Sequence, residues 1–217
     1  MDKLIIAEKP SVALRIAIAL GGSSQKREVL NGVSYFVIDE VNSKTYIAPA
    51  VGHIFTMHQV GNKGGYPVLD VEWAPSYKVS SALYYTKKYF DVFEQLSKKC
   101  GIFINACDYD VEGTVIGTNI INFIAHGVEN AKRMKFSTTT PSDLRDAYEN
   151  LLPLDINNFY AGETRHILDW LWGINLSRAL TSALQTGKPL SIGRVQGPTL
   201  AILANREIEI KEFVPKP

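Results

Sequence analysis

The sequence is 217 residues long, 46% hydrophobic and 21% charged, with a formal net charge of +1. This length allows one large domain or two small ones, and the composition is typical of a soluble globular protein. No stretch approaches the roughly 20 apolar residues that cross a membrane, and the N-terminus lacks the apolar run of a signal peptide. Cys100 and Cys107 have no metal-type spacing and are expected to be free thiols. We therefore predict a cytoplasmic protein without a membrane partner, while a net charge near zero leaves a polyanionic partner open.

The first half of the chain alternates strand and helix patterns. Residues 4–7, 33–39, 45–51, 101–106 and 133–136 are predicted strands, residues 10–22, 82–99 and 111–126 are predicted helices, and residues 61–81 are a predicted irregular loop. Strands that alternate with helices form βαβ units. This half therefore predicts a Rossmann-like α/β fold with a mainly parallel sheet.

From Pro141 onward the strand signals vanish. Residues 141–151, 155–172, 173–186 and 197–212 all carry helical periodicity. We therefore expect a helical domain after the α/β domain, with the boundary near residues 138–142.

The segment NACDYDVEGTVIG, residues 105–117, places three carboxylates on alternate positions. Asp108 and Asp110 follow a predicted strand and Glu112 begins the next helix, at the sheet edge where α/β proteins bind ligands. Like charges this close require protonation or a cation. Oxygen ligands without nearby His or Cys favour Mg²⁺. Glu8, at the end of the first strand and followed by Lys9, is expected to reach the same edge.

Two other interpretations of the acidic cluster are an EF-hand loop and a helix cap. An EF-hand loop is excluded, because its twelfth position is Asn119 rather than a bidentate glutamate. A solvated acidic turn that caps the N-terminus of a helix remains open, since Asp and Glu are favoured there in any protein.

Several segments resemble type IA DNA topoisomerases. LIIAEKPSVA and ACDYDVEGTVIG resemble the two acidic blocks of that family's Toprim domain. The segments AVGHIFTM, RMKFSTTTPSDLRDAY, ETRHILDWLWGINLSRAL and LSIGRVQGPTL resemble later family segments, in family order. The resemblance implies a Toprim domain over residues 1–140 and the start of the helical DNA-binding domain IV over residues 141–217. It is closest to the archaeal topoisomerase I and topoisomerase III-like branches.

The resemblance also implies a reaction and roles in it. The family cuts one DNA strand through a 5′-phosphotyrosine, passes another strand and reseals the first without ATP. By motif position, Glu8 would handle the proton of the leaving 3′ oxygen and also ligate metal. Lys9 and Arg165 would stabilise the phosphate. Mg²⁺ would be held by Asp108 and Asp110, with Glu112 as an outer or second ligand.

DNA contacts are implied at further positions. Partners would be single-stranded or negatively supercoiled DNA and the remaining topoisomerase domains downstream. The expected contact residues are His53, Arg133, Phe136, Thr140, Arg145, Arg165, Ser191, Gly193, Arg194 and Gln196. Structural alternatives are open for three of them: a lone structural histidine at 53, a surface arginine on a helix at 165 and a tight turn at Gly193.

The nucleophile departs from the family pattern. None of the ten tyrosines lies in a Tyr-Pro-Arg-Thr-like motif, and Tyr66-Pro67 is followed by Val68-Leu69. We therefore expect an N-terminal fragment, truncated before the arch and tyrosine domains and inactive in cleavage by itself. The rival hypotheses are a stand-alone Toprim metal-dependent nuclease and a non-catalytic DNA-binding module.

Overall fold

The computed structural model describes residues 1–61, 64–185 and 187–215. Its contacts divide the chain into two compact units. Unit 1 comprises Met1–Thr56 and Trp73–Thr164, and unit 2 comprises Met57–Glu72 and Arg165–Pro217. The divisions fall within two strands and one helix, at residues 56/57, 72/73 and 164/165.

The elements follow each other in a largely alternating order. The strands are β1 (Lys3–Ala7), β2 (Lys26–Leu30), β3 (Val33–Asp39), β4 (Lys44–Pro49), β5 (Phe55–Gln59), β6 (Val71–Pro75), β7 (Ile102–Ala106), β8 (Ala131–Arg133) and β9 (Leu152–Pro153). The α-helices are α1 (Pro10–Gly21), α2 (Ser76–Val79), α3 (Lys87–Ser97), α4 (Val111–Ile120), α5 (Pro141–Glu149), α6 (Ile156–Leu184) and α7 (Gln196–Glu212). Short 3₁₀ turns cover Gly22–Ser24, Ser81–Thr86 and Val128–Asn130, and a π turn covers Ile121–Ala125.

Unit 1 is organised by a seven-stranded sheet in the order β2-β3-β4-β1-β7-β8-β9. The four central strands, β4, β1, β7 and β8, run parallel, and β2, β3 and β9 add antiparallel pairs at the two sides. The register pairs Ala7 with both Pro49 and Ala106. The chain therefore leaves β1, β4 and β7 at one level of one sheet edge.

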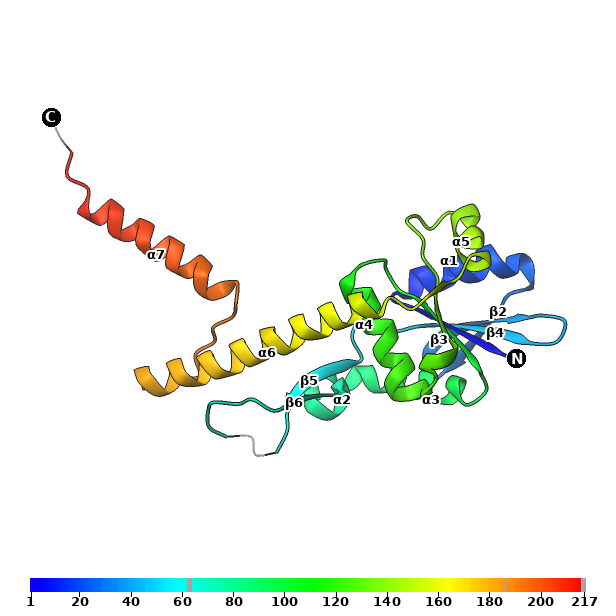
Figure 1. Cartoon of the computed structure of the whole chain (residues 1–217), viewed down its shortest axis with the longest axis horizontal. Coiled ribbons are helices and arrows are strands. Elements are labelled where there is room, and N and C mark those ends of the chain that lie inside the picture. Colours follow the sequence, from blue (N-terminus) through cyan, green and yellow to red (C-terminus); the bar gives the residue numbers. More distant parts are fainter. Residues whose placement is uncertain (62–63, 186, 216–217) are drawn as a thin grey trace. The chain divides into compact units, whose positions relative to one another are not determined.

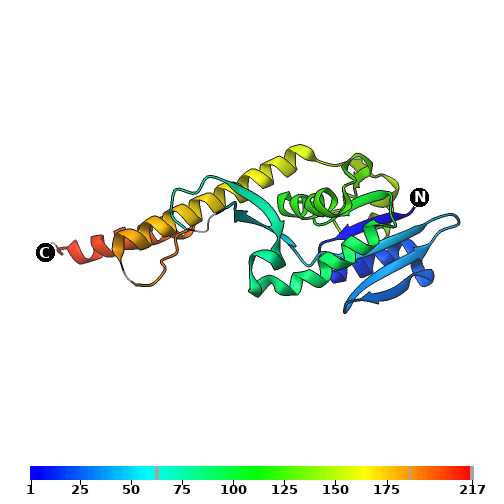
Figure 2. The ribbon, with the colours of Figure 1, turned by 90° about the horizontal axis from the view of Figure 1, so that it is seen from below.

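Helices cover both faces of this sheet. Figure 1 shows α1 and α5 on one face and α3 and α4 on the other. Each face has its own core: Ile16 of α1 and Leu144 of α5 belong to one, Phe93 of α3 and Ile120 of α4 to the other. The buried central strands are almost continuously apolar, as strands covered on both faces are. In the turned view of Figure 2, α3 (teal) crosses its face of the sheet.

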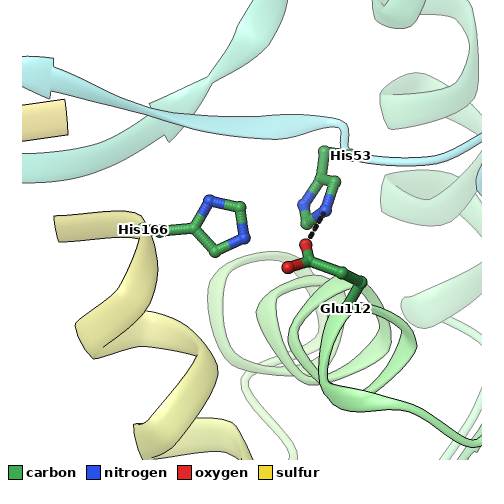
Figure 3. Close-up of side chains that lie close together, drawn as sticks. All are labelled: His53, Glu112 and His166. Atoms are coloured by element: carbon green, nitrogen blue, oxygen red, sulfur yellow. Dashed lines mark hydrogen bonds and ion pairs between the residues drawn. The ribbon is translucent and has the colours of Figure 1, made fainter. Parts of the chain in front are cut away.

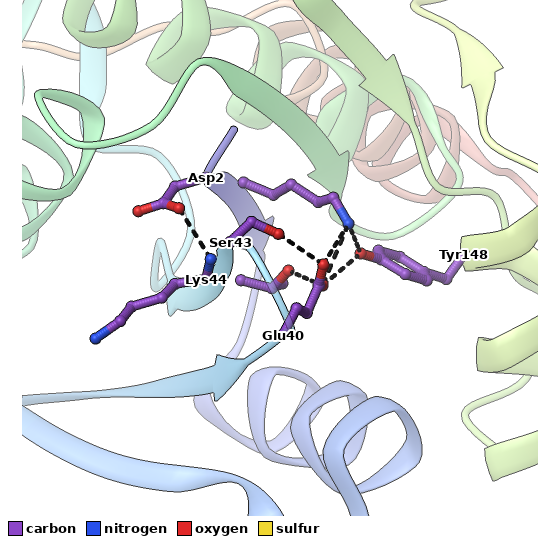
Figure 4. Close-up of polar contacts among 7 residues, drawn as sticks. Asp2, Glu40, Ser43, Lys44 and Tyr148 are labelled. Atoms are coloured by element: carbon purple, nitrogen blue, oxygen red, sulfur yellow. Dashed lines mark hydrogen bonds and ion pairs between the residues drawn. The ribbon is translucent and has the colours of Figure 1, made fainter.

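At the edge of unit 1 where β1 begins, a polar network ties α5 to the sheet (Figure 4). Lys3 Nζ donates to the hydroxyl of Tyr148 on α5 (2.9 Å) and to both carboxylate oxygens of Glu40 (3.0 and 3.2 Å). Ser43 and Thr45 donate their hydroxyls to the same carboxylate (2.9 and 2.6 Å). Nearby, Asp2 accepts the backbone N–H of Lys44 (2.9 Å). These bonds fix α5 against the first half of the chain.

Unit 2 contains most of α6, the whole of α7 and the loop before β6. Asn175 of α6 accepts the N–H of Val68 (2.6 Å) and donates to its carbonyl (2.8 Å). Arg178 donates to the Gln59 side chain and to the Gly65 carbonyl (3.0 and 2.7 Å). Together these bonds hold the loop along the helix. No helix among the described residues is both long and apolar enough to cross a membrane.

The predicted α/β fold followed by a helical region is confirmed, with local differences. β2, whose sequence KREVL is mostly exposed, was missed because an edge strand needs no apolar pattern. The expected loop 61–81 contains β6 and α2, and the last of the β elements, β9, lies beyond Pro141. The two helices predicted over residues 155–172 and 173–186 are one helix, α6, over Ile156–Leu184, because one glycine at 173 does not end a helix; residue 186 lies outside the described residues.

The predicted boundary near residues 138–142 differs from the division made by contacts. α5 packs on α1 through Leu144 and Ala147, within unit 1. The first turns of α6 also belong to unit 1, where a Cβ at Gly162 would lie 2.4 Å from Val115 of α4. Unit 1 therefore ends at Thr164, about 20 residues after the predicted boundary.

Candidate active site

The site lies where β1 and β7 end side by side. Glu8 and Lys9 directly follow β1, and Cys107 and Asp108 directly follow β7. The Glu8 carbonyl accepts the N–H groups of Val51 (2.8 Å) and Gly52 (3.4 Å) from the chain that leaves β4. The ends of β1 and β4 are thereby tied together, and the parallel register places the end of β7 beside that of β1, at the carboxyl edge where α/β sheets bind ligands.

Lys9 bridges the two acidic segments. Its Nζ lies 2.7 Å from Asp108 Oδ2 and 3.3 Å from Glu8 Oε1. The hydrogen bond to Asp108, and then that to Glu8, raises the pKa of Lys9 above its usual range. Because the lysine stays protonated, it offers a fixed positive charge between two carboxylates at the end of the sheet.

The acidic loop has a compact local structure. Asp110 caps α4, since its Oδ1 accepts the N–H of Gly113 (2.7 Å). A Cβ on Gly113 would lie 2.2 Å from the Asp108 carbonyl oxygen, so the motif's glycine is required by close approach. Asp110 therefore caps the helix, as the alternative interpretation of the acidic cluster predicts. The cap uses Oδ1, and a carboxylate has a second oxygen that can accept a bond or ligate a cation.

Glu112 pairs with a histidine from another loop of unit 1. His53 Nε2 lies 3.0 Å from Glu112 Oε2, and Figure 3 shows the two side chains pointing toward one another. His166, also drawn in Figure 3, lies on α6 in unit 2. His53, predicted as a DNA contact, thus meets one of the predicted metal ligands, and both side chains are about one-third exposed.

Two buried residues support the loop from below. Arg133 is 1% exposed, and it donates to the Asn105 carbonyl and side-chain oxygens (3.0 and 2.8 Å) and to the Asp108 carbonyl (2.7 Å). Burial lowers the pKa of its guanidinium. The Asn105 side chain in turn accepts the N–H of Cys107 (3.0 Å). Asn105 was missed as a site residue, although a polar side chain inside an otherwise apolar strand was a usable signal.

The other candidates of the RMKFSTTTPSDLRDAY segment have structural roles. Arg133 lies beneath the surface rather than on it, and Phe136, 9% exposed, belongs to the core under α1 and α5. Thr140 caps α5, accepting the N–H of Asp143 (3.4 Å). Arg145 donates to the Ala19 carbonyl at the end of α1 (2.7 Å). Each of these four therefore makes a structural contact within unit 1; Thr140 and Arg145 are exposed, whereas Arg133 and Phe136 are buried, and the DNA contacts stay a prediction.

The unit 2 candidates gather around one carboxylate. Arg194 donates through Nη2 to Asp169 Oδ2 (3.1 Å) and through Nε to Asp169 Oδ1. Arg165, one turn before Asp169 on α6, lies 3.8 Å from Asp169 Oδ2 through its Nε. Ser191 and Gly193 belong to the loop before α7, and Gln196 is the first residue of α7. Asp169 was missed by sequence reasoning.

The donor set of unit 1 fits a hard divalent cation. Glu8, Asp108, Asp110 and Glu112 supply carboxylate oxygens on the segments that follow β1 and β7, and Lys9 lies between two of them. The expectation of no nearby histidine is wrong, because His53 contacts Glu112. Carboxylates are the ligands that Mg²⁺ accepts most readily, and it fills its remaining positions with water. The chemistry of this donor set therefore suits Mg²⁺.

Fold and edge together define an α/β protein with an acidic site at the carboxyl ends of its parallel strands. The model of the Toprim domain family matches residues 3–139, and that of the DNA topoisomerase family matches residues 153–217. The chain therefore belongs to the Toprim family, and the predicted resemblance to DNA topoisomerases is confirmed.

Individual relatives agree with this assignment. DNA topoisomerase 1 of Methanocaldococcus jannaschii is 46% identical over 222 residues, covering all of this chain and 29% of the relative. DNA topoisomerase 1 of Pyrococcus horikoshii is 47% identical, covering 99% of this chain and 32% of the relative. The structure of full-length topoisomerase I from Thermotoga maritima matches with a TM-score of 0.64 and 26% identity, over 98% of this chain and 31% of that one. The chain thus spans about a third of these relatives.

Proposed function

We propose that this chain is the N-terminal region of a type IA DNA topoisomerase, which cuts and reseals single strands of negatively supercoiled DNA in the cytoplasm. One observation carries the proposal: Lys9 lies between Glu8 and Asp108 where β1 and β7 end. A cation bracketed by carboxylates at a sheet edge serves phosphoryl transfer, in which charge develops on a phosphate and a proton moves at a leaving oxygen.

Each group of the edge has a role that its chemistry permits. Glu8 exchanges a proton with the 3′ oxygen that leaves on cleavage and returns on resealing. Lys9 donates to a phosphate oxygen and offsets the charge of the transition state. Asp108 and Asp110 would hold Mg²⁺, with Glu112 as a further ligand, and the metal when bound would supply charge that keeps the cleaved end in place.

Arginines of unit 2 would bind the strand itself. Arg165 and Arg194 carry planar guanidinium groups that match the geometry of a phosphodiester. Arg194 already pairs with Asp169 through two nitrogens, as it would with two oxygens of a phosphate. The loop from Ser191 to Gln196 supplies additional backbone N–H and side-chain donors.

We expect the tyrosine that cleaves DNA to lie elsewhere in the full protein. The ten tyrosines include none in a Tyr-Pro-Arg-Thr-like motif. The chain by itself is therefore expected to bind Mg²⁺ and single-stranded DNA without forming a covalent adduct.

The test incubates the purified chain with 5′- and 3′-labelled single-stranded DNA and Mg²⁺, stops the reaction with SDS, and separates adducts and fragments. We expect anisotropy-detected DNA binding, no adduct and no new fragment. A covalent adduct would overturn the claim that the tyrosine lies elsewhere. Mg²⁺-dependent nicking that disappears in Asp108→Ala would instead identify a stand-alone nuclease, and absence of DNA binding would remove the main proposal.

A further inference from the structure

One face of α6 holds the loop that precedes α7. Four positions, each four residues after the last, meet the segment Leu190–Arg194, and residues four apart lie on the same side of a helix. These positions are Asp169, Gly173, Ser177 and Thr181. All of them, and the segment they meet, belong to unit 2.

The contacts in the middle of this face are hydrogen bonds in which hydroxyls of α6 accept backbone N–H groups of the loop. Ser177 Oγ accepts the N–H of Ile192 (3.0 Å) and lies 3.3 Å from the Ile192 carbonyl oxygen. Thr181 Oγ1 accepts the N–H of Leu190 (2.9 Å) and donates to the Ser177 carbonyl, one turn earlier (2.7 Å). Two alternate residues of the loop are thereby paired with two successive turns of the helix.

Serine and threonine on α6 suit this contact because of the hydrogen-bonding groups that a helix leaves available. Backbone N–H and C=O groups in the middle of a helix are already bonded within it, so a second chain that lies along the helix must pair with side chains. Serine and threonine hydroxyls both donate and accept, and they are short enough to let the loop lie close. At position 173 a Cβ would lie 3.9 Å from the Ile192 carbonyl, so glycine leaves the loop additional room.

The end of the loop is held by charge. Arg194 extends to Asp169, three turns before Thr181, and its two-nitrogen contact fixes the orientation of the guanidinium. The hydrogen bonds to the two hydroxyls hold the backbone at Leu190 and Ile192. Arg194 follows two residues later, so its side chain starts from a backbone that is already held on α6. The position of Arg194 therefore depends on Ser177 and Thr181, which act through the backbone of Ile192 and Leu190.

We infer that Ser177 and Thr181 are positioning residues that hold the Leu190–Arg194 loop ready for the phosphodiester backbone of single-stranded DNA. The inference rests on the proposed function, in which this loop contacts DNA. Ordering a loop at the moment of binding costs affinity, and a loop already ordered on its helix avoids that cost.

The experiment uses the whole 217-residue chain with a fluorescein-labelled oligothymidylate and two readouts. Fluorescence anisotropy gives the DNA affinity, and amide hydrogen exchange gives the protection of the N–H groups of Leu190 and Ile192. The variants are Thr181→Val, which removes the hydroxyl at nearly constant shape, Thr181→Ser, which keeps it, and Ser177→Ala. Thr199→Val is the matched control, because that hydroxyl is on α7 and donates to the carbonyl of its N-cap residue, Val195 (2.8 Å), rather than to α6 or to Leu190–Arg194.

We expect Thr181→Val and Ser177→Ala each to lose amide protection at the loop and to bind DNA about threefold to tenfold more weakly. Thr181→Ser and Thr199→Val should keep both properties. Unchanged DNA affinity in Thr181→Val, with or without loss of protection, would overturn the inference and leave the proposed function intact. No binding by the unmodified chain would overturn the proposed function itself, and this inference with it.

Discussion

Lys9 and Asp108, 99 residues apart in the sequence, meet at 2.7 Å across the ends of β1 and β7. The pairing of Ala7 with Ala106 in the parallel register brings them to the same level. Asp108 is also a predicted Mg²⁺ ligand. We therefore expect Lys9 and the metal to compete for the Asp108 carboxylate.

Removal of Lys9 should strengthen Mg²⁺ binding to this chain. Lys9→Ala deletes a positive charge from beside Glu8 and Asp108, and an exposed ion pair of this kind changes affinity about twofold to fivefold. Asp108→Asn should weaken Mg²⁺ binding by more than that, because it removes a ligand charge. Titration calorimetry with MgCl₂ measures both, and Lys26→Ala, which breaks the pair with Asp39 in unit 1, is the control. Weaker Mg²⁺ binding in Lys9→Ala would contradict the competition.

Arg133 should be essential for stability. Arg133→Leu removes three buried hydrogen bonds, to the Asn105 carbonyl and side-chain oxygens and to the Asp108 carbonyl, and leaves these oxygens with backbone N–H donors alone. The expected cost is about 3 kcal/mol in the free energy of unfolding. Urea denaturation followed by circular dichroism measures this cost. Lys132→Ala, an exposed change on the same strand, should stay within about 0.5 kcal/mol. Equal midpoints for the two variants would show that Arg133 does not hold the loop.

Sequence reasoning succeeded where one local pattern decides the structure. The apolar runs of β1 and β7 predict buried parallel strands, and residues that directly follow such strands must meet at one edge; Glu8, Lys9 and Asp108 do so. It failed where distant contacts decide. Nothing local to Arg133 or Phe136 reveals that both side chains are buried, because motif position marks them only as candidates for DNA contact. Likewise, Asp169 gains its role only when the loop folds back to bring Arg194 to it.

The network around Glu40 should make stability depend on pH. Burial alone would raise the pKa of Glu40, but hydrogen bonds from Thr45, Lys3 and Ser43 outweigh it and lower the pKa from 4.5 to about 2. A carboxyl with a depressed pKa in the folded state stabilises the fold above its unfolded pKa. That contribution is lost as pH falls from 4.5 toward 2.

Glu40→Gln isolates this contribution. The full shift corresponds to about 3 kcal/mol, which solvent screening at this partly exposed site reduces to about 1–2 kcal/mol. We expect the variant to be less stable than the unmodified chain at pH 7 and nearly equal to it at pH 2, in urea denaturation across this range. Glu94→Gln, which breaks an exposed pair with Lys98, should change little at either pH. A stability difference that is the same at pH 7 and pH 2 would refute the role of ionised Glu40.

Gly113→Ala tests whether the glycine of the acidic motif serves the loop or the ligand. The added Cβ would lie 2.2 Å from the Asp108 carbonyl oxygen and 2.9 Å from its nitrogen, so the backbone between β7 and α4 must shift. We expect a loss of about 1–3 kcal/mol in the free energy of unfolding, together with weaker Mg²⁺ binding, because the shift moves Asp108 itself. Gly64→Ala is the matched control, since a Cβ there meets no atom within 4 Å. Normal stability and normal Mg²⁺ affinity in Gly113→Ala would mean that the loop accommodates the methyl group, and the glycine would then need an explanation from DNA rather than from the fold.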